Sequence, residues 1–386
     1  MKHVALSRSV PGHWLSWAAL ATLAMLGAPR AQADDFQVSG FLTLAGGRTF
    51  GAAVDPSTLS LSDRFSDRCP CFIADWGHAG VYGPSWSLRP ESRVGVQLNY
   101  DLTPEWHITG QTVARAVPGY RPDLEWAYVT YSGLAGWTFQ VGRKRLPLYD
   151  YSDYQDVGYA YSWIRPPADV YGWDVVNYNG ASASWSGSVQ GFQVRASGYG
   201  GGETSKQNLY SRLIYGKGQD PLTVKWSGII GGDVSVEYKG ITARLAYMKS
   251  DYSDSLNPDK VPQKTYGGSL NAELGDWTVR SEFSKFDRKE QGYISKATML
   301  SAAYRMGEWT PHLTWSRYRE NSTLPTYNPV RTQTWSLGLR RELTPQSSLK
   351  IQFDKTRDSG VTADGTARSL YAGSARAISV AYDQVF

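Results

Sequence analysis

Three aspartates, Asp150, Asp153 and Asp156, are the residues whose type and spacing point most directly to chemistry. A spacing of three residues can place carboxylates on one face of a helical turn. Residues 143–145 read Arg-Lys-Arg, so a strongly basic stretch leads into this acidic one. Opposed carboxylates and cations create an electric field across a gap, and such a field acts on ions and polar solutes.

Residues suited to catalysis are sparse in this chain. After residue 33 there are only three histidines, His78, His107 and His312, and no Gly-x-Ser-x-Gly sequence. Two sulfurs without nearby histidines make a poor zinc site, and Cys69 and Cys71 flank a single proline. We therefore expect no catalytic residue, metal or cofactor, and an enzyme is the least favoured interpretation.

Residues 1–33 have the composition of an export signal. Lys2 and Arg8 make its start positive, an apolar stretch of 14 residues follows at 14–27, and Ala-Gln-Ala at 31–33 forms a cleavage site. This stretch is shorter than the roughly 20 residues of a membrane-spanning helix. Removing Lys2, Arg8 and Arg30 lowers the net charge from +5 to +2, which argues against a nucleic-acid partner.

The rest of the chain, residues 34–386, alternates apolar and polar residues as strands do. In one stretch Val96 and Leu98 share a face, while Arg93 and Gln97 share the other. No later apolar run could span a membrane as a helix, so a membrane protein of this sequence must be a closed barrel. The alternation predicts one all-β antiparallel transmembrane barrel with strands near 36–48, 87–101, 106–116, 123–132, 137–145, 174–186, 192–200, 222–238, 241–251, 265–274, 277–287, 294–306, 309–320, 331–342, 348–357 and 375–386. That count of sixteen is good to about two strands.

Four tryptophans follow very short turns: Trp106, Trp137, Trp277 and Trp309. The connections between these hairpins are longer and polar. Short turns at one end and long loops at the other are typical of outer-membrane barrels, in which aromatic girdles mark both membrane interfaces. We predict that the four rings form the periplasmic girdle. A soluble sandwich or several domains would also alternate, but no linker or change of composition divides the chain.

The chain ends in an alternating strand, with Ile378, Val380 and Tyr382 on one face and Phe386 as the last residue. With the export signal, sixteen strands and short turns, this arrangement resembles the Gram-negative general porin family over the whole of 34–386. The resemblance implies that Tyr382 and Phe386 are part of the signal read by the barrel assembly machinery. It also implies an outer-membrane location, contacts with lipid and lipopolysaccharide, and a homotrimer.

One departure from the family pattern bears on trimer formation. In trimeric porins the second external loop reaches a neighbouring subunit, whereas residues 117–121 form only a very short loop here.

In that family the third external loop, after the fifth strand, folds into the barrel and narrows it. The matching segment is 146–171, and its many tyrosines and tryptophans could be buried against an inner wall with their polar atoms bonded. The alternative is a packed cap on the barrel mouth. We predict a pore constriction formed by Arg93, Arg115, Lys144, Asp150, Asp153, Asp156, Arg165 and Asp169, in which the four aspartates face Arg93, Arg115 and Lys144.

The function predicted from these features is a water-filled channel for passive diffusion of small hydrophilic solutes and ions. A substrate-selective channel for anions or sugars, using aromatic and arginine residues near 143–171, is the main alternative. A structural or adhesive barrel whose long loops bind outside partners is a third interpretation.

Overall fold

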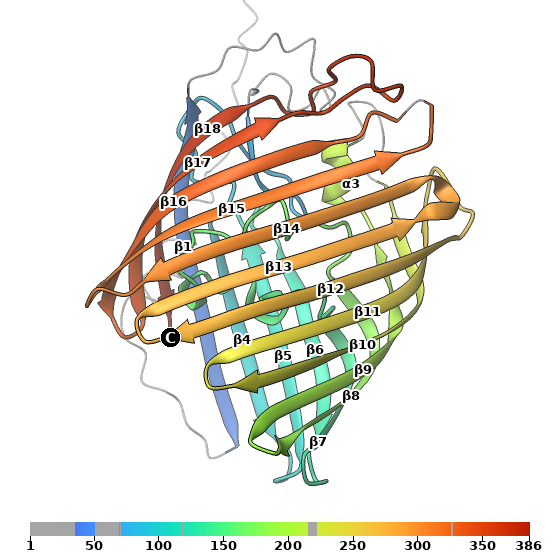
Figure 1. Ribbon diagram of the computed structural model, residues 1–386. Coiled ribbons are helices and arrows are strands. Elements are labelled where there is room, and N and C mark those ends of the chain that lie inside the picture. The colour runs from blue at the N-terminus through green and yellow to red at the C-terminus, as the bar shows by residue number, and fades with distance from the viewer. Residues whose placement is uncertain (1–34, 51–68, 70, 118, 215–221, 326) are drawn as a thin grey trace, which may run out of the picture.

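The computed structural model describes residues 35–50, 69, 71–117, 119–214, 222–325 and 327–386. In those ranges sixteen antiparallel strands close into one barrel (Figure 1). They are β1 (Phe36–Phe50), β4 (Arg93–Asp101), β5 (Trp106–Arg115), β6 (Pro122–Tyr131), β7 (Trp137–Arg145), β8 (Asn177–Val189), β9 (Phe192–Ser205), β10 (Val224–Tyr238), β11 (Ile241–Asp254), β12 (Val261–Leu274), β13 (Trp277–Arg288), β14 (Tyr293–Tyr304), β15 (Trp309–Ser322), β16 (Arg331–Thr344), β17 (Ser347–Asp358) and β18 (Ala375–Val385). The predicted fold class is confirmed, while the predicted export signal at 1–33 lies outside the described residues.

Two predicted strands begin too early. The strand expected at 87–101 starts at Arg93, because residues 88–91 form turns around Pro90. The strand expected at 174–186 runs instead from Asn177 to Val189. Its Ser- and Gly-rich sequence carries little apolar alternation, so the pattern defines its ends poorly.

The outer face of the barrel is apolar. Leu245 is 74% exposed, Leu337 59% and Leu270 57%, and each alternates with polar residues that face inward. In water such side chains would be costly, but lipid covers the outer face of a transmembrane barrel. The alternation therefore separates a lipid-facing side from a polar lumen.

The four turn tryptophans lie at one end of the barrel. They begin β5, β7, β13 and β15, which all point the same way because an even number of antiparallel steps separates them. All four rings are exposed, and Trp106 and Trp277 each pack 4.8 Å from a tyrosine on the paired strand. That this end faces the periplasm, with Trp106, Trp137, Trp277 and Trp309 as its girdle, stays a prediction.

The barrel closes where β18 pairs with β1. Tyr382 lies opposite Leu44, and the backbone of Phe386 exchanges hydrogen bonds of 2.8 and 3.0 Å with Gly40. The last residue therefore completes the pairing of the first strand, and the sheet keeps no open edge in the lipid.

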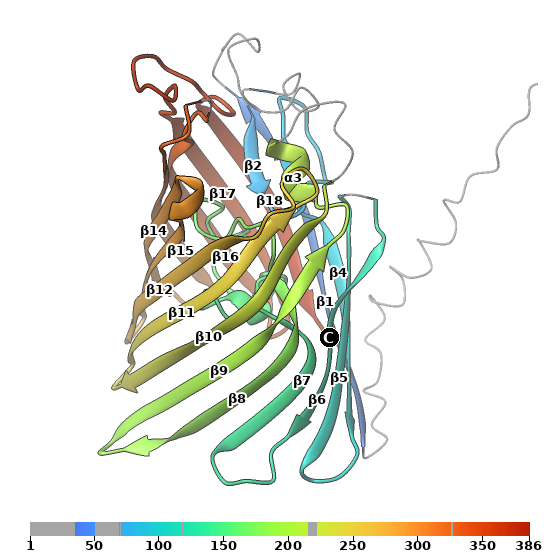
Figure 2. The same ribbon diagram turned by 90° about the vertical axis from the view of Figure 1, so that its right-hand side faces the viewer.

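Several connecting segments occupy the interior and the loop end. A hairpin of β2 (Phe72–Asp75) and β3 (Gly80–Tyr82) and the short helix α3 (Leu209–Ile214) lie at the loop end (Figure 2). They share an apolar cluster with the connection between β17 and β18. In the described part of the chain, no helix is long and apolar enough to cross a membrane.

We predict that Gly180→Ala destabilises the barrel by about 1–3 kcal/mol, because overpacking a close contact forces the backbone to move. A Cβ at Gly180 would collide with the backbone of Gly200 and Gly201 on the paired strand. Gly198→Ala is the matched control in the same hairpin, since its Cβ would meet nothing closer than 4.0 Å. The stability of both variants is measured by guanidinium unfolding in lipid vesicles, with electrophoretic mobility as the readout of folding. Equal unfolding midpoints for the two variants would contradict the prediction.

Candidate functional site

The segment after β7, residues 146–171, runs inside the barrel and packs its aromatic rings together. We call it the inner segment. Tyr149, Tyr151, Tyr161, Trp163 and Tyr171 are all buried, and their ring centroids lie 4.7–6.3 Å apart where they pair. The rings also bond the wall, since Trp163 Nε1 donates to Thr314 Oγ1 of β15 at 2.8 Å. Figure 1 shows this segment, in green, within the outline of the barrel.

One carboxylate of the segment, Asp156, binds two arginines of the wall. Its Oδ2 accepts from Arg115 at 2.7 Å and from Arg145 at 2.6 Å, and its carbonyl oxygen accepts from Arg93 at 2.7 Å. Glu125 completes the cluster, with Arg115 at 2.7 Å and Arg145 at 3.2 Å. Two carboxylates and two guanidiniums therefore neutralise one another.

The pKa of Asp156 reflects this cluster. Burial alone would raise it, but Arg115 and Arg145 overcome burial and hold the pKa well below its ordinary value. This pKa is lower in the folded barrel than in the unfolded chain, so the ion pairs stabilise the fold at pH values above the pKa of the unfolded chain. That stabilisation is lost as the pH falls through the pKa of the folded barrel.

A second cluster surrounds Arg165. Its guanidinium binds Glu91 with two contacts of 2.5 Å, Asp354 at 2.7 Å and Ser379 at 2.7 Å. Arg165 is 4% exposed and also lies over the ring of Phe72, 5.0 Å from its centroid. One side chain thus joins the inner segment to β17, β18 and the hairpin of β2 and β3.

Two of the other three predicted aspartates, Asp150 and Asp169, bind elsewhere than predicted. Asp150 accepts hydrogen bonds from Ser269 and Asn271 of β12, and Asp169 accepts from Ser316 at 2.7 Å and Thr332 at 2.6 Å. Neither contacts Arg93, Arg115 or Lys144. The prediction assumed a helical turn through all three closely spaced aspartates, but only residues 152–154 form one, so Asp150 and Asp156 need not share a face.

The remaining predicted pair, Asp153 and Lys144, lines an open cavity of about 370 Å³. Asp153 is exposed, and in the described ranges it forms no ion pair. Lys144 Nζ donates to Ser182 Oγ at 3.0 Å and to Gln140, and among described residues it too lacks a carboxylate partner. Arg195 of β9 faces the same cavity without an ion pair to any described residue.

Sequence reasoning missed three members of these groups. Arg145 belongs to the cluster at Asp156, Asp354 belongs to the cluster at Arg165, and Arg195 lines the open cavity. Arg195 could have been found, because it alternates with the outward-facing Val194 and Ala196. No group of three or more His, Cys, Asp or Glu side chains in the described part of the chain could hold a metal ion.

Comparison with known proteins supports one family. Residues 17–361 match the model of the Gram-negative porin family. A search of curated proteins gave no match.

Solved structures give the same fold. OmpF of Salmonella typhi, in complex with daunomycin, has 10% sequence identity, covers 93% of this chain and 100% of its own, and has a TM-score of 0.58. The anion-selective porin of Comamonas acidovorans has 14% identity, and the match covers 91% of this chain and 99% of that porin, with a TM-score of 0.53. OmpT of Vibrio cholerae, described in a trimer form, has 9% identity, and the match covers 92% of this chain and 100% of OmpT, with a TM-score of 0.51. At such identities the likeness concerns the fold alone.

We predict that Arg165→Gln destabilises the protein by about 3–5 kcal/mol, because removing one partner leaves buried charges uncompensated. Glu91 is 5% exposed and Asp354 is 1% exposed, so water could not replace the guanidinium. Arg195→Gln, which removes an unpaired arginine of the open cavity, is the control and should leave the unfolding midpoint nearly unchanged. Equal midpoints for the two variants would contradict a stabilising role for Arg165.

Proposed function

The chain belongs to the Gram-negative porin family, and from this premise we propose the route that solutes take through it. The protein lies in the outer membrane and forms a water-filled channel for passive diffusion of small hydrophilic solutes. Diffusion requires no covalent step, cofactor or catalytic residue. We propose that solutes pass along the wall formed by β6–β13, and that segment 146–171 narrows the channel against this wall.

Two cavities along one wall support this route. A cavity of about 730 Å³ lies at the loop end of β6, β8 and β9, where Arg121, Asp123 and Glu203 line it. The cavity of about 370 Å³ follows along β7–β13. On the opposite side, inward residues of β15–β18 such as Thr314 and Ser379 are buried against the inner segment. The described part of the lumen is thus filled on one side and open on the other.

The single observation that carries the proposal is the division between paired and unpaired charges. Asp156 lies in a cluster of two carboxylates and two guanidiniums, and Arg165 is buried between Glu91 and Asp354, so both side chains are bound in ion pairs away from the open cavity. Asp153 of the inner segment and Lys144 and Arg195 of the wall line the open cavity without ion pairs in the described ranges. We propose that these three side chains set the ion preference.

A substrate-selective channel is the second candidate, and one observation favours it. The same cavity is lined by tyrosines, among them Tyr154, which is 40% exposed, and Tyr178 and Tyr199. Rings beside hydroxyls and cations suit a sugar or an organic anion. Solutes that block the current at low concentration would favour this candidate over general diffusion.

Assembly and partners follow from the family. We propose cleavage of residues 1–33, recognition of Tyr382 and Phe386 by the barrel assembly machinery, and contact of the outer face with lipid and lipopolysaccharide. A homotrimer is also proposed, supported by the trimer form of OmpT of Vibrio cholerae. Trp106, Trp137, Trp277 and Trp309 would then stand at the periplasmic interface, where amphipathic rings prefer to lie.

Replacing Asp153 by Asn should shift the reversal potential toward anions, because the open cavity loses a negative charge that no described cation pairs. Lys144→Gln and Arg195→Gln should each shift it toward cations. The measurement is the reversal potential in a salt gradient across a planar bilayer.

Asp364→Asn is the charge-matched control, since Asp364 lies exposed in the connection between β17 and β18. If Asp153, Lys144 and Arg195 variants all keep the wild-type selectivity, the ion preference is set elsewhere in the channel.

Deleting Phe386 should lower the amount of folded barrel in the outer membrane far more than it lowers synthesis. The physical reason is that the deletion removes both backbone hydrogen bonds to Gly40 at the closing pair of strands. Quantifying heat-modifiable protein in outer-membrane fractions, against total protein, provides the test. Deleting Phe386 without any loss of folded barrel would refute the assembly role.

A further inference from the structure

A small cavity of about 30 Å³ lies away from the proposed solute route, at the loop end of β15 and β16. Five aromatic side chains from separate parts of the chain line it, together with two carboxylates. We call this group the aromatic cage: Trp76, Tyr210, Tyr318, Tyr327, Tyr371, Asp169 and Glu320. It lies on the lumen side, because Glu320 and Tyr318 share the inward face of β15 with Ser316 and Thr314, which bond the inner segment.

Glu320 has no cationic partner among the described residues. It is 3% exposed, and its two oxygens accept four hydrogen bonds, all from neutral donors. The donors are the hydroxyls of Tyr293 at 2.9 Å, Tyr318 at 2.7 Å and Tyr327 at 2.8 Å, and the Val330 N–H at 2.8 Å. These donors fill the acceptor positions of the carboxyl group but bring no positive charge to it.

Asp169 repeats this pattern on the inner segment. Its oxygens accept only from the hydroxyls of Ser316 and Thr332, and burial raises its pKa. In the described ranges neither Asp169 nor Glu320 forms an ion pair, whereas Asp156, Glu91 and Asp354 are all bound by arginines. A buried carboxyl group without a cation beside it is shifted toward its neutral form, and a bound cation would favour the charged form instead.

The rings are suited to hold such a cation. Trp76 lies 5.6 Å from Tyr371 and 6.0 Å from Tyr210, measured between ring centroids. Electron-rich ring faces attract cations, and a phenol that donates to a carboxylate is polarised so that its ring becomes more negative. Tyr318 and Tyr327 both donate to Glu320, so the carboxylate strengthens the attraction even though its own acceptor positions are full.

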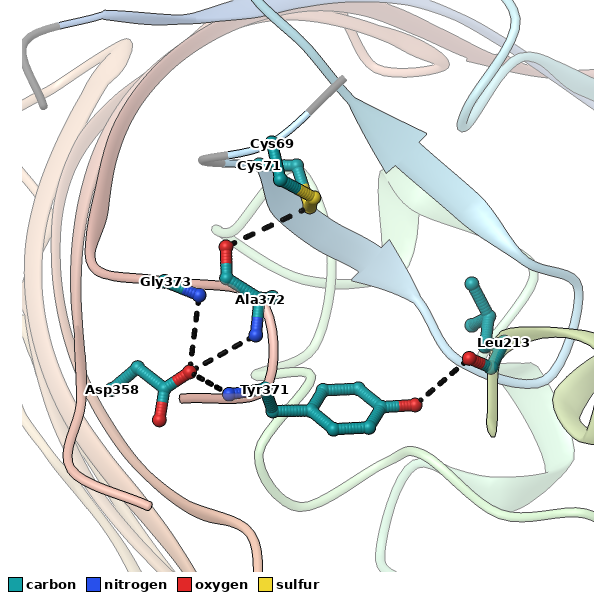
Figure 3. The surroundings of a disulfide bond; sticks show 7 residues. All are labelled: Cys69, Cys71, Leu213, Asp358, Tyr371, Ala372 and Gly373. Carbon is teal, nitrogen blue, oxygen red and sulfur yellow. Dashed lines mark hydrogen bonds between the residues drawn. A yellow bond between two sulfur atoms is a disulfide. The ribbon is translucent and has the colours of Figure 1, made fainter. Parts of the chain in front are cut away.

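The cage is also held in place before any ligand arrives. Tyr371 donates from its hydroxyl to the Leu213 carbonyl at 3.0 Å, and Asp358 accepts the N–H groups of residues 371–373 at 2.6–3.1 Å (Figure 3). The disulfide between Cys69 and Cys71 lies against the Ala372 carbonyl in the same view. Ring positions fixed in this way reduce the ordering cost of binding.

We propose that the aromatic cage binds an organic ammonium cation, and that a methylated ammonium head group is the chemistry that fits it. A fully methylated, quaternary head group offers no N–H donor and so does not compete for the filled acceptor positions of Glu320. The volume exceeds what one water needs but admits only a small head group. Because the cage lies on the lumen side, its ligand comes from water and not from the lipid.

The test is isothermal titration calorimetry of the full-length protein in detergent, with tetramethylammonium as the probe and sodium at equal ionic strength as background. We expect saturable binding at about millimolar concentration. Glu320→Gln keeps the shape of the side chain and removes its charge, and Trp76→Leu removes a ring. Each should weaken binding at least tenfold, while Asp364→Asn, which removes an exposed carboxylate, should leave it unchanged.

Three outcomes would overturn the proposal. They are no saturable heat from the wild type, equal binding of the neutral probe tert-butanol, or wild-type affinity in Glu320→Gln. Heat-modifiability establishes that each variant is folded, and if Trp76→Leu is not, the comparison of Glu320→Gln with Asp364→Asn decides the matter.

Discussion

A strand in hydrocarbon has no water to satisfy its backbone, so every N–H and C=O group must be bonded within the sheet. This constraint closes the barrel between β18 and β1 and makes Phe386 a partner of Gly40. As a result of closure, one face of every strand lies toward lipid and the other lies toward an enclosed lumen. A sixteen-stranded lumen is too wide for wall side chains to fill. Its polar face must meet either water or another part of the chain.

Both solutions occur in this barrel, on opposite sides. Along β15–β18 the inner segment fills the lumen, and its Arg165 is bound to Glu91 and Asp354. Along β7–β13 the wall stays open, and Lys144 and Arg195 keep no ion pair among described residues. Removing one partner of a buried ion pair leaves an expensive uncompensated charge, so the Arg165 pairs hold the inner segment against this side of the wall.

The sequence predicted the features that depend on local pattern. Alternation such as that of Val96 and Leu98 against Arg93 and Gln97 is enough to count strands and assign faces. Aromatic content marks 146–171 as a segment that needs burial. The partners of Asp150 and Asp169 could not be predicted, because they depend on the path of an irregular loop. The aromatic cage could not be predicted either, since its rings come from five separate stretches of the chain.

The central claim is that solutes pass along β6–β13 while the opposite side is closed, and cysteine accessibility tests it most directly. Both native cysteines form a disulfide, so an introduced cysteine is the only free thiol of the described chain. Ser184 lines the open cavity, whereas Ser348 also faces inward but is 0% exposed. The measurement is the block of bilayer current by a cationic methanethiosulfonate reagent. The account predicts rapid block of Ser184→Cys and none of Ser348→Cys, and block of Ser348→Cys alone would contradict it.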